Sequence, residues 1–229
     1  MQSSSPLGAN VFLTGANRGI GLGLVKEILK IGGVTNLFAG CREPDQAQEL
    51  KELAKRNKAL KLVKIDVSSD ESIKNAVSEV CKVLGSDDGL NTLINNAGIL
   101  EKEGGTLKAP DRAVYLRHFD VNVVGTVATT AAFLPLLRKT VANSGAVVRV
   151  NVAYGMSKAA MHHFSKMFSV DEPDIVSVAI HPGWIVTDMG GPNAPVTLDE
   201  RIPQLVKLIG TLTKADSGKL MDHEKEIEP

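Results

Sequence analysis

The chain has 229 residues and a mass of 24.4 kDa, and 43% of its residues are apolar. That length suits one large domain or two small ones, and that apolar share supports a sizeable core, which excludes intrinsic disorder. The 26 basic and 26 acidic side chains cancel. No net field therefore attracts nucleic acid or an anionic membrane, and we expect neither as a partner.

The cysteines and the first residues bear on the cellular compartment. Cys41 and Cys81 lie far apart and have no Cys or His at metal-ligand spacing, so we expect neither a disulfide framework nor a metal site. Residues 1–10 lack the positive start and the apolar stretch of a signal peptide. We therefore expect a cytoplasmic protein in which residues 1–8 form a flexible lead-in.

Short apolar, β-branched runs alternate with longer segments of helical period, which is the pattern of βαβ units and a parallel sheet. In chain order, strands are predicted at 10–14, 35–40, 60–65, 90–95, 146–152 and 175–180, with a weaker seventh at 219–222. Helices are predicted at 19–31, 45–57, 71–84, 112–138 and 154–168. No Pro/Gly/Ser-rich linker divides this pattern. We therefore expect a single α/β domain over residues 1–229, with a Rossmann-type, doubly wound parallel sheet of about seven strands and helices on both faces.

Helix ends and one apolar run carry further predictions. Asp70 is expected to cap the third helix, and the glycine pair at 32–33 is expected to end the first. The uncharged run at 121–137 contains polar and helix-breaking residues and is short for a membrane span. We interpret it as a buried helix.

A glycine-rich turn, TGANRGIG at residues 14–21, connects the first predicted strand to the first predicted helix. Glycine is needed where the backbone turns tightly and approaches a pyrophosphate, which binds amide groups at the positive end of a helix. The turn therefore predicts a dinucleotide-binding site, and the alternative is a turn that serves only strand-to-helix packing. The expected contacts are Gly15, Asn17, Arg18, Gly19, Ile20 and Gly21.

The end of the second predicted strand bears on which dinucleotide binds. An acidic residue there holds the ribose 2′-hydroxyl of NAD, whereas a basic residue suits the 2′-phosphate of NADP. Here the strand runs into Arg42, and Arg18 in the glycine turn is a second possible cation. We therefore favour NADP(H) over NAD(H), although the adjacent Glu43 and the frequency of surface arginines keep the alternative open.

Five motifs occur in one order along the chain. After the glycine turn come Asp66-Val67, Asn95-Asn96-Ala97-Gly98, Tyr154-Gly155-Met156-Ser157-Lys158 and Pro182-Gly183-Trp184-Ile185-Val186-Thr187. In this order and spacing they resemble the short-chain dehydrogenase/reductase superfamily, over nearly the whole chain to about residue 222. The segments around Arg42 and HPGWIVTDMGG look most like the carbonyl-reductase branch that includes sniffer and the C-factor-like proteins.

The resemblance implies a catalytic set of Tyr154, Lys158 and Asn122. Tyr154 would protonate the substrate carbonyl as hydride arrives from the nicotinamide, and Lys158 would also hold the nicotinamide ribose. Residues four apart share one face of a helix, and an ammonium group lowers the pKa of a neighbouring phenol toward the range useful for proton transfer. Asn122 matches the family's helix Asn, which bends its helix and connects the Lys to a proton relay; the alternative is a capping Asn at a helix break.

The resemblance also implies coenzyme contacts beyond the glycine turn. Asp66 and Val67 would contact adenine, whereas Tyr154 and Lys158 would face the nicotinamide ribose. Small residues are expected beside the adenosine ribose, because the ligand approaches the backbone there. These are Asn96, Ala97 and Gly98, and the expected nicotinamide border consists of Pro182, Gly183, Ile185 and Thr187. The five histidines are assigned no function.

The chain departs from the family pattern before Tyr154. The family has a substrate-orienting Ser at the exit of the fifth strand, about a dozen residues before the catalytic Tyr. Counting back twelve residues from Tyr154 reaches Ala142, and Ser144 lies at the wrong end of the predicted strand. Only Ala153 separates that strand from Tyr154, whereas such connections usually take two to six residues. Either a stretch after Val152 is missing from the sequence as printed, which we favour, or the chain has a true deletion and little reductase activity.

Two functions follow from these expectations. The first is an NADP(H)-dependent oxidoreductase that transfers hydride between nicotinamide and a small carbonyl or alcohol substrate, with Tyr154 as general acid/base beside Lys158. The alternative is a catalytically weak or inactive nucleotide-binding sensor of the C-factor type. The resemblance places a dimer surface on the helices at 112–138 and 154–168, which implies a homodimer or homotetramer, with a monomer as the alternative.

Overall fold

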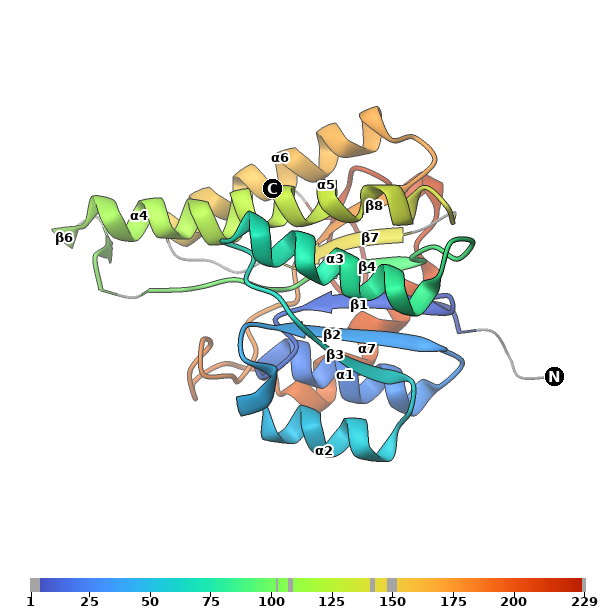
Figure 1. The fold of residues 1–229 in the computed structure, drawn as a ribbon. Helices are drawn as coiled ribbons and strands as arrows, with labels where there is room; N and C mark the ends of the chain where they lie inside the picture. Colours follow the sequence, from blue (N-terminus) through green and yellow to red (C-terminus); the bar gives the residue numbers. More distant parts are fainter. Residues whose placement is uncertain (1–4, 102, 107–108, 141–142, 148–151, 228–229) are drawn as a thin grey trace.

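The computed structural model describes residues 5–101, 103–106, 109–140, 143–147 and 152–227. Its centre is a seven-stranded sheet in which neighbouring strands run parallel (Figure 1). The strand order is β3, β2, β1, β4, β7, β8, β9, which confirms the predicted doubly wound parallel sheet. The strands are β1 Asn10–Thr14, β2 Asn36–Cys41, β3 Leu60–Lys64, β4 Thr92–Asn95, β7 Asn143–Val147, β8 Val176–Ile180 and β9 Leu220–Met221.

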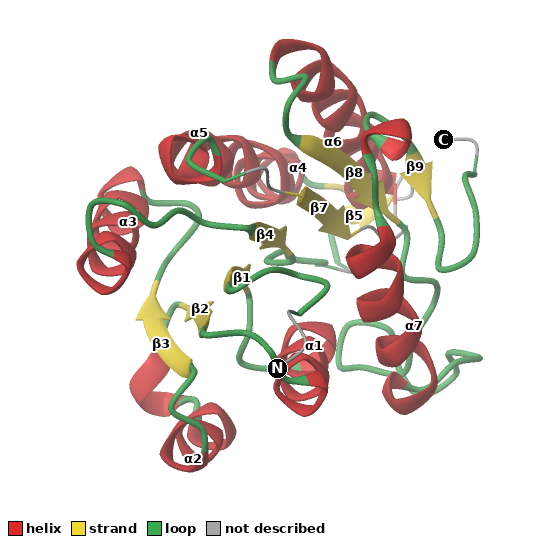
Figure 2. Ribbon diagram, turned by 90° about the vertical axis from the view of Figure 1, so that its right-hand side faces the viewer, coloured by secondary structure: helices red, strands yellow, loops and turns green. Residues whose placement is uncertain are grey.

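Helices cover both faces of this sheet. Figure 2 shows α1, α2 and α7 on one face, and α3, α4, α5 and α6 on the other. A separate two-stranded hairpin, β5 Gly105–Thr106 and β6 Ala109–Pro110, precedes α4. The helices are α1 Gly19–Ile31, α2 Gln48–Arg56, α3 Asp70–Leu84, α4 Arg112–Phe119, α5 Gly125–Leu137, α6 Val152–Asp171 and α7 Leu198–Thr211, with short helical turns η1 Pro44–Gln46, η2 Asp120–Val124 and η3 Lys214–Asp216.

Strand β1 shows how the sequence builds the two halves of the core. All five of its residues are buried, as expected for a central strand covered on both faces. Because successive side chains point to opposite faces, Val11 and Leu13 join the core beneath α1 and α7, whereas Phe12 joins the core beneath α3 and α5. The Phe12 and Phe133 rings lie 4.4 Å apart between centroids. The sheet is therefore fixed from both sides, with its carboxyl edge left for a ligand.

The strand before α6 is displaced from its predicted position. The sequence predicts a strand at 146–152, but β7 occupies Asn143–Val147 and pairs Ala146 with Asn95 of β4. Because α6 already begins at Val152, a strand continuing to that residue would leave no room for the chain to reverse. Residues 148–151, between the two elements, lie outside the described residues.

Helix ends show one confirmation and one error. Helix α1 ends at Ile31 and is followed by Gly32, whose positive φ of 77° favours glycine, as expected for a residue that ends a helix. The predicted cap of α3 is wrong by one residue, because Ser69 caps the helix by accepting a hydrogen bond from the Ser72 amide at 3.3 Å, and Asp70 is the first helical residue. Helix α7 lies where the sequence predicts no element.

The helix predicted at 112–138 is present but interrupted. A π-helical turn, η2, separates α4 from α5 and contains Asn122. By length and composition alone Arg112–Leu137 could cross a membrane. It packs against α3 and α6 within the domain, which supports the interpretation as a helix of the core.

Candidate coenzyme and active site

A cavity of about 280 Å³ lies at the carboxyl edge of the sheet. The strand order runs from β1 to β2 and β3 on one side and from β1 to β4 and β7 on the other, so it reverses at β1. The cavity opens at this reversal, which is the usual ligand position in such sheets. The structure brings together at this cavity most of the residues predicted to hold a coenzyme. They are Gly15, Asn17, Arg18, Gly19, Ile20, Gly21, Arg42, Asp66, Val67, Asn96, Ala97, Gly98, Lys158, Pro182 and Thr187.

The glycine turn forms one wall of the cavity in a shape that larger residues would not allow. Gly15 and Gly19 have φ values of 67° and 54°. A Cβ on Gly21 would lie 2.1 Å from the carbonyl oxygen of Gly15, and one on Gly15 would lie 2.9 Å from the Cα of Ala97. The turn therefore leaves the first residues of α1 open to the cavity, a position that suits a phosphate group.

Asn96 and Thr14 join the turns that follow β4 and β1. The Asn96 side-chain amide donates to the Thr14 carbonyl at 2.9 Å and to the Gly15 carbonyl at 3.1 Å. In return, the Thr14 hydroxyl accepts hydrogen bonds from the Asn96 and Ala97 amides, both at 3.0 Å. Thr14 is buried, so these exchanged bonds hold the two turns in one fixed arrangement.

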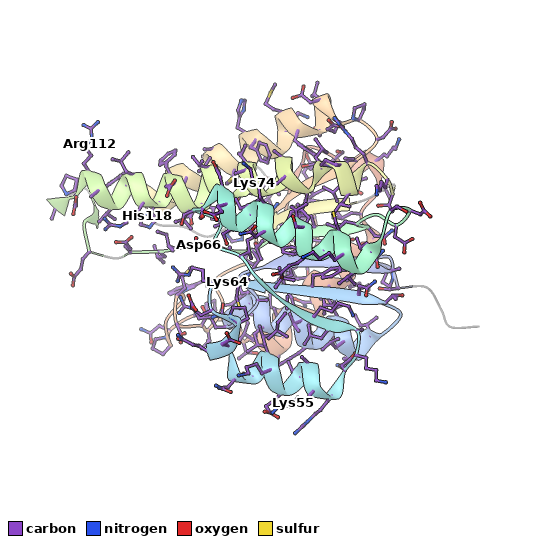
Figure 3. The ribbon with its side chains drawn as sticks, viewed as in Figure 1. Lys55, Lys64, Asp66, Lys74, Arg112 and His118 are labelled. Atoms are coloured by element: carbon purple, nitrogen blue, oxygen red, sulfur yellow. The ribbon has the colours of Figure 1, made fainter. Side chains whose placement is uncertain are left out.

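Asp66 is held as an anion near Arg42. It lies where the chain leaves β3 toward α3 (Figure 3). Its carboxylate accepts hydrogen bonds from the Ser68 hydroxyl at 2.7 Å and the Ser68 amide at 3.0 Å. Burial raises the pKa of Asp66, but these bonds and the charge of Arg42 outweigh it, so the pKa lies below its usual value. The cavity thus has an oriented carboxylate and a nearby guanidinium at this end.

Asn122 connects the helix bulge to the floor of the cavity. It is almost fully buried in η2. Its Oδ1 accepts from the Ile99 amide at 2.8 Å, and its Nδ2 donates to the Ile99 carbonyl at 3.1 Å and to the Ser157 hydroxyl at 3.3 Å. These bonds satisfy the buried amide from two neighbouring segments. Asn122 therefore sits at a bulge within the helix, not at a capped end.

Lys158 lies on α6 beside Asn122 and Gly98. A Cβ on Gly98 would lie 3.1 Å from Asn122 Oδ1 and 4.0 Å from Lys158 Nζ. Burial lowers the pKa of Lys158 to about 8. Tyr154 stands one helical turn earlier on α6, but its side chain lies outside the described residues. The predicted Tyr/Lys pair therefore shares a helix, and one member lines the cavity.

The turn after β8 closes the far side of the cavity. Pro182 and Thr187 line it, whereas Gly183 and Ile185 do not. The side chain of Thr187 lies 3.7 Å from where a Cβ of Gly19 would be, so this turn faces the glycine turn directly. The two turns therefore enclose the middle of the cavity from opposite sides.

His118, which carried no predicted role, is a structural residue of α4 (Figure 3). Its ring is fully buried. Nδ1 donates to the Val114 carbonyl at 2.8 Å, and Nε2 accepts from the Glu101 amide at 3.1 Å. Both ring nitrogens are thus used to fix the segment after β4.

Further residues line the cavity without belonging to a predicted contact. Most of them are sequence neighbours of motif residues, so their position next to a motif could have predicted that they line the cavity. Burial raises the pKa of the Cys41 thiol, so it forms an uncharged wall. The set comprises Cys41, Glu43, Ile65, Ser68, Ile99, Val121, Asp188 and Met189. Within the part of the chain that the structure describes, no group of three His, Cys, Asp or Glu side chains could hold a metal ion.

Residues 9–195 match the family model described as short chain dehydrogenase. The chain belongs to the short-chain dehydrogenase family. An uncharacterized oxidoreductase of Schizosaccharomyces pombe is 35% identical to this short-chain dehydrogenase, over 95% of this chain and 96% of the relative. That comparison runs over 249 positions, more than the 229 residues of this chain, so the relative has residues where this chain has none.

Solved carbonyl reductases share the fold of this short-chain dehydrogenase closely. The NADPH-bound carbonyl reductase from chicken fatty liver matches with a TM-score of 0.91 and 32% identity, over 96% of this chain and 98% of the other. The carbonyl reductase Sniffer of D. melanogaster matches with a TM-score of 0.89 and 32% identity, over 94% and 97%. The resemblance to the carbonyl-reductase branch is thereby confirmed.

Proposed function

We propose that this short-chain dehydrogenase is an NADP(H)-dependent reductase of small carbonyl compounds. The observation that carries the proposal is the cavity itself, which is lined by the glycine turn, by Arg18 and Arg42, and by Lys158. The glycine turn suits a dinucleotide, because it is too tight for any residue with a Cβ at Gly15 or Gly21. Such a turn lets the backbone approach a pyrophosphate closely. The NADPH bound to the chicken carbonyl reductase agrees with this reading.

The protein groups would divide the work of binding and proton transfer. Arg18 and Arg42 would bind the 2′-phosphate, and the amides at the start of α1 would bind the pyrophosphate. When bound, the coenzyme supplies or accepts the hydride. Tyr154 would give a proton to the carbonyl oxygen, and Lys158, still mostly protonated at pH 7, would favour the phenolate that remains. Asn122 would hold the bulge that supports this end of the cavity.

Tyr154→Phe tests the proposed proton donor. The variant removes one hydroxyl and keeps the ring, so we expect turnover to be abolished and the Kd for NADPH to stay within about twofold. NADPH oxidation with a panel of small aldehydes, ketones and quinones gives the first quantity, and quenching of protein fluorescence gives the second. Full activity in the variant would refute the role of Tyr154.

A second function, a nucleotide-binding sensor, is favoured by one feature of the sequence. No serine lies between Ser144 and Ser157, so the expected substrate-orienting hydroxyl is lacking in the segment that joins β7 to α6, although that link, at 148–151, has an ordinary length. We propose that part of the length difference from the fission yeast relative falls in this link. Tight NADPH binding without turnover, in protein whose intact mass is 24.4 kDa, would establish the sensor and exclude the reductase.

We also propose a cytoplasmic homodimer or homotetramer that uses the outer faces of α4, α5 and α6. Leu116 on α4, Val124 on η2, and Met167 and Val170 on α6 are exposed apolar side chains. Where exposed apolar side chains form one contiguous patch, they mark a protein–protein interface. Light scattering after size-exclusion chromatography measures the mass, and a monomer at micromolar concentration would refute the assembly.

A further inference from the structure

Asp188 lines the cavity, although the sequence assigned it no role. It follows Thr187 on a turn held by three hydrogen bonds. The Gly191 amide donates to the Thr187 carbonyl at 2.7 Å, the Gly190 amide donates to the Thr187 hydroxyl at 2.9 Å, and the Trp184 indole donates to the Gly190 carbonyl at 2.8 Å. The carboxylate of Asp188 is thus presented from a preorganised turn.

The partner of Asp188 is the arginine of the glycine turn. Arg18 Nη1 lies 3.2 Å from Asp188 Oδ2, and both side chains line the cavity. Arg18 stands immediately before α1, and Asp188 comes from the turn after β8, so their ion pair joins two segments that border the cavity. The pair is also accessible to a ligand, because 65% of the Arg18 side chain and 81% of the Asp188 side chain are exposed.

The charges around the cavity explain why this pair matters. Among the described lining residues, the cations Arg18, Arg42 and Lys158 are matched by the anions Glu43, Asp66 and Asp188. A phosphate-bearing dinucleotide is a polyanion, so each lining carboxylate opposes its binding. Asp66 is already committed to Ser68. Asp188 is the carboxylate that pairs with a cation we assign to the 2′-phosphate.

We propose that Asp188 sets the preference between NADP(H) and NAD(H) by competing with the 2′-phosphate for the Arg18 guanidinium. This inference rests on the proposed function. With NADP(H) bound, Arg18 leaves Asp188 and binds the phosphate; with NAD(H) bound, the ion pair stays intact. Asp188 is therefore a positioning residue that acts through Arg18, and it weakens the hold on the phosphorylated coenzyme so that product coenzyme is released readily.

Asp188→Asn tests the competition, because the amide keeps the shape of the side chain and removes its charge. We expect the Kd for NADPH to fall about two- to fivefold, the range measured for exposed ion pairs, with little change in the Kd for NADH. The gain should shrink when salt is raised from about 20 mM to about 200 mM, because screening weakens exposed pairs. Both constants come from fluorescence titration of the full chain.

Two further variants make the result decisive. In an Arg18→Gln background, Asp188→Asn should change neither constant; a gain that persists there would mean that the carboxylate repels the coenzyme directly. Asp174→Asn removes the same charge from another exposed ion pair, with Lys214 at 2.8 Å, at the opposite edge of the sheet, and should leave both constants unchanged.

The possible outcomes separate this inference from the proposed function. The role of Asp188 would be overturned if Asp188→Asn raised the affinity for NADPH and NADH equally, or if it changed neither affinity. It would also be overturned if both affinities fell equally, because the ion pair would then only hold the two turns together. If the unmodified protein binds neither coenzyme saturably, the proposed function itself fails, whatever the variants do.

Discussion

Replacing Lys158 by methionine should make the free protein more stable at neutral pH. The side chain is only 9% exposed, and burial lowers its pKa from the ordinary value of 10.5 to about 8. The unfolded chain therefore binds a proton more readily than the folded chain. A difference of this size corresponds to roughly 3 kcal/mol of unfolding free energy lost by keeping the ammonium buried at pH 7. Methionine has a similar length and carries no charge.

The pH dependence gives the sign of the effect independently of packing. Below pH 8 both states hold the proton, and the full cost is present. Between pH 8 and 10.5 the folded Lys158 is neutral while the unfolded one is still charged, so the stability of the unmodified protein rises with pH. The Lys158→Met variant lacks this rise. Its advantage should therefore decrease steadily from pH 7 toward pH 10.

Urea unfolding followed by circular dichroism at several pH values measures this difference. Lys82→Met, an exposed lysine on α3, controls for the loss of a lysine as such and should not reproduce the pH dependence. An advantage of Lys158→Met that is constant between pH 7 and 10 would show that burial of the charge is not its cause. A variant less stable than the unmodified protein at pH 7 would refute the reasoning altogether.

Two other substitutions test the packing of the site. Gly21→Ala should abolish saturable coenzyme binding in a fluorescence titration and lower the free energy of unfolding by about 2 kcal/mol or more. The reason is that the added Cβ would lie 2.1 Å from the Gly15 carbonyl oxygen. Normal coenzyme binding in this variant would contradict the tight turn. Arg201→Met on α7 should raise the melting temperature, corresponding to about 1–3 kcal/mol, because Nε and Nη1 of this buried arginine have no hydrogen-bond partner among the described residues. Arg201→Lys keeps the charge and should not raise the melting temperature. If the two variants had equal melting temperatures, the buried charge of Arg201 would not be what lowers stability.

The architecture could be predicted from the sequence because its main signals are local. Apolar β-branched runs such as 10–14 and 175–180 mark strands buried on both faces, and α1 was placed to the residue because glycines stand at both of its ends. The position of β7 could not be read in the same way. Its β-branched run continues to Val152, and only the competing need to start α6 there moves the strand toward the N-terminus.

The site was predictable where a motif fixes the backbone, and it was missed where contacts join distant segments. The glycine turn and Asn96 were found because close approach to the backbone restricts residue type. Ser68 lies two residues after Asp66, so the local pattern of an Asp side chain that binds the backbone two residues on could have found it. Asp188 also follows a motif residue directly, but nothing local shows that it reaches Arg18, 170 residues away. The resemblance implied a bend at Asn122, but it did not show that the bend is a π-helical turn or that Ile99, 23 residues earlier, supplies its hydrogen-bond partners.

The reciprocal bonds between Thr14 and Asn96 have a consequence for engineering this protein. They join residues 82 positions apart in the chain, so a change on either side transmits to the other loop and to every ligand that rests on both. Altered coenzyme preference is therefore best sought among solvent-facing charges such as Arg18, Arg42 and Asp188, which can be exchanged one at a time without disturbing the scaffold below them.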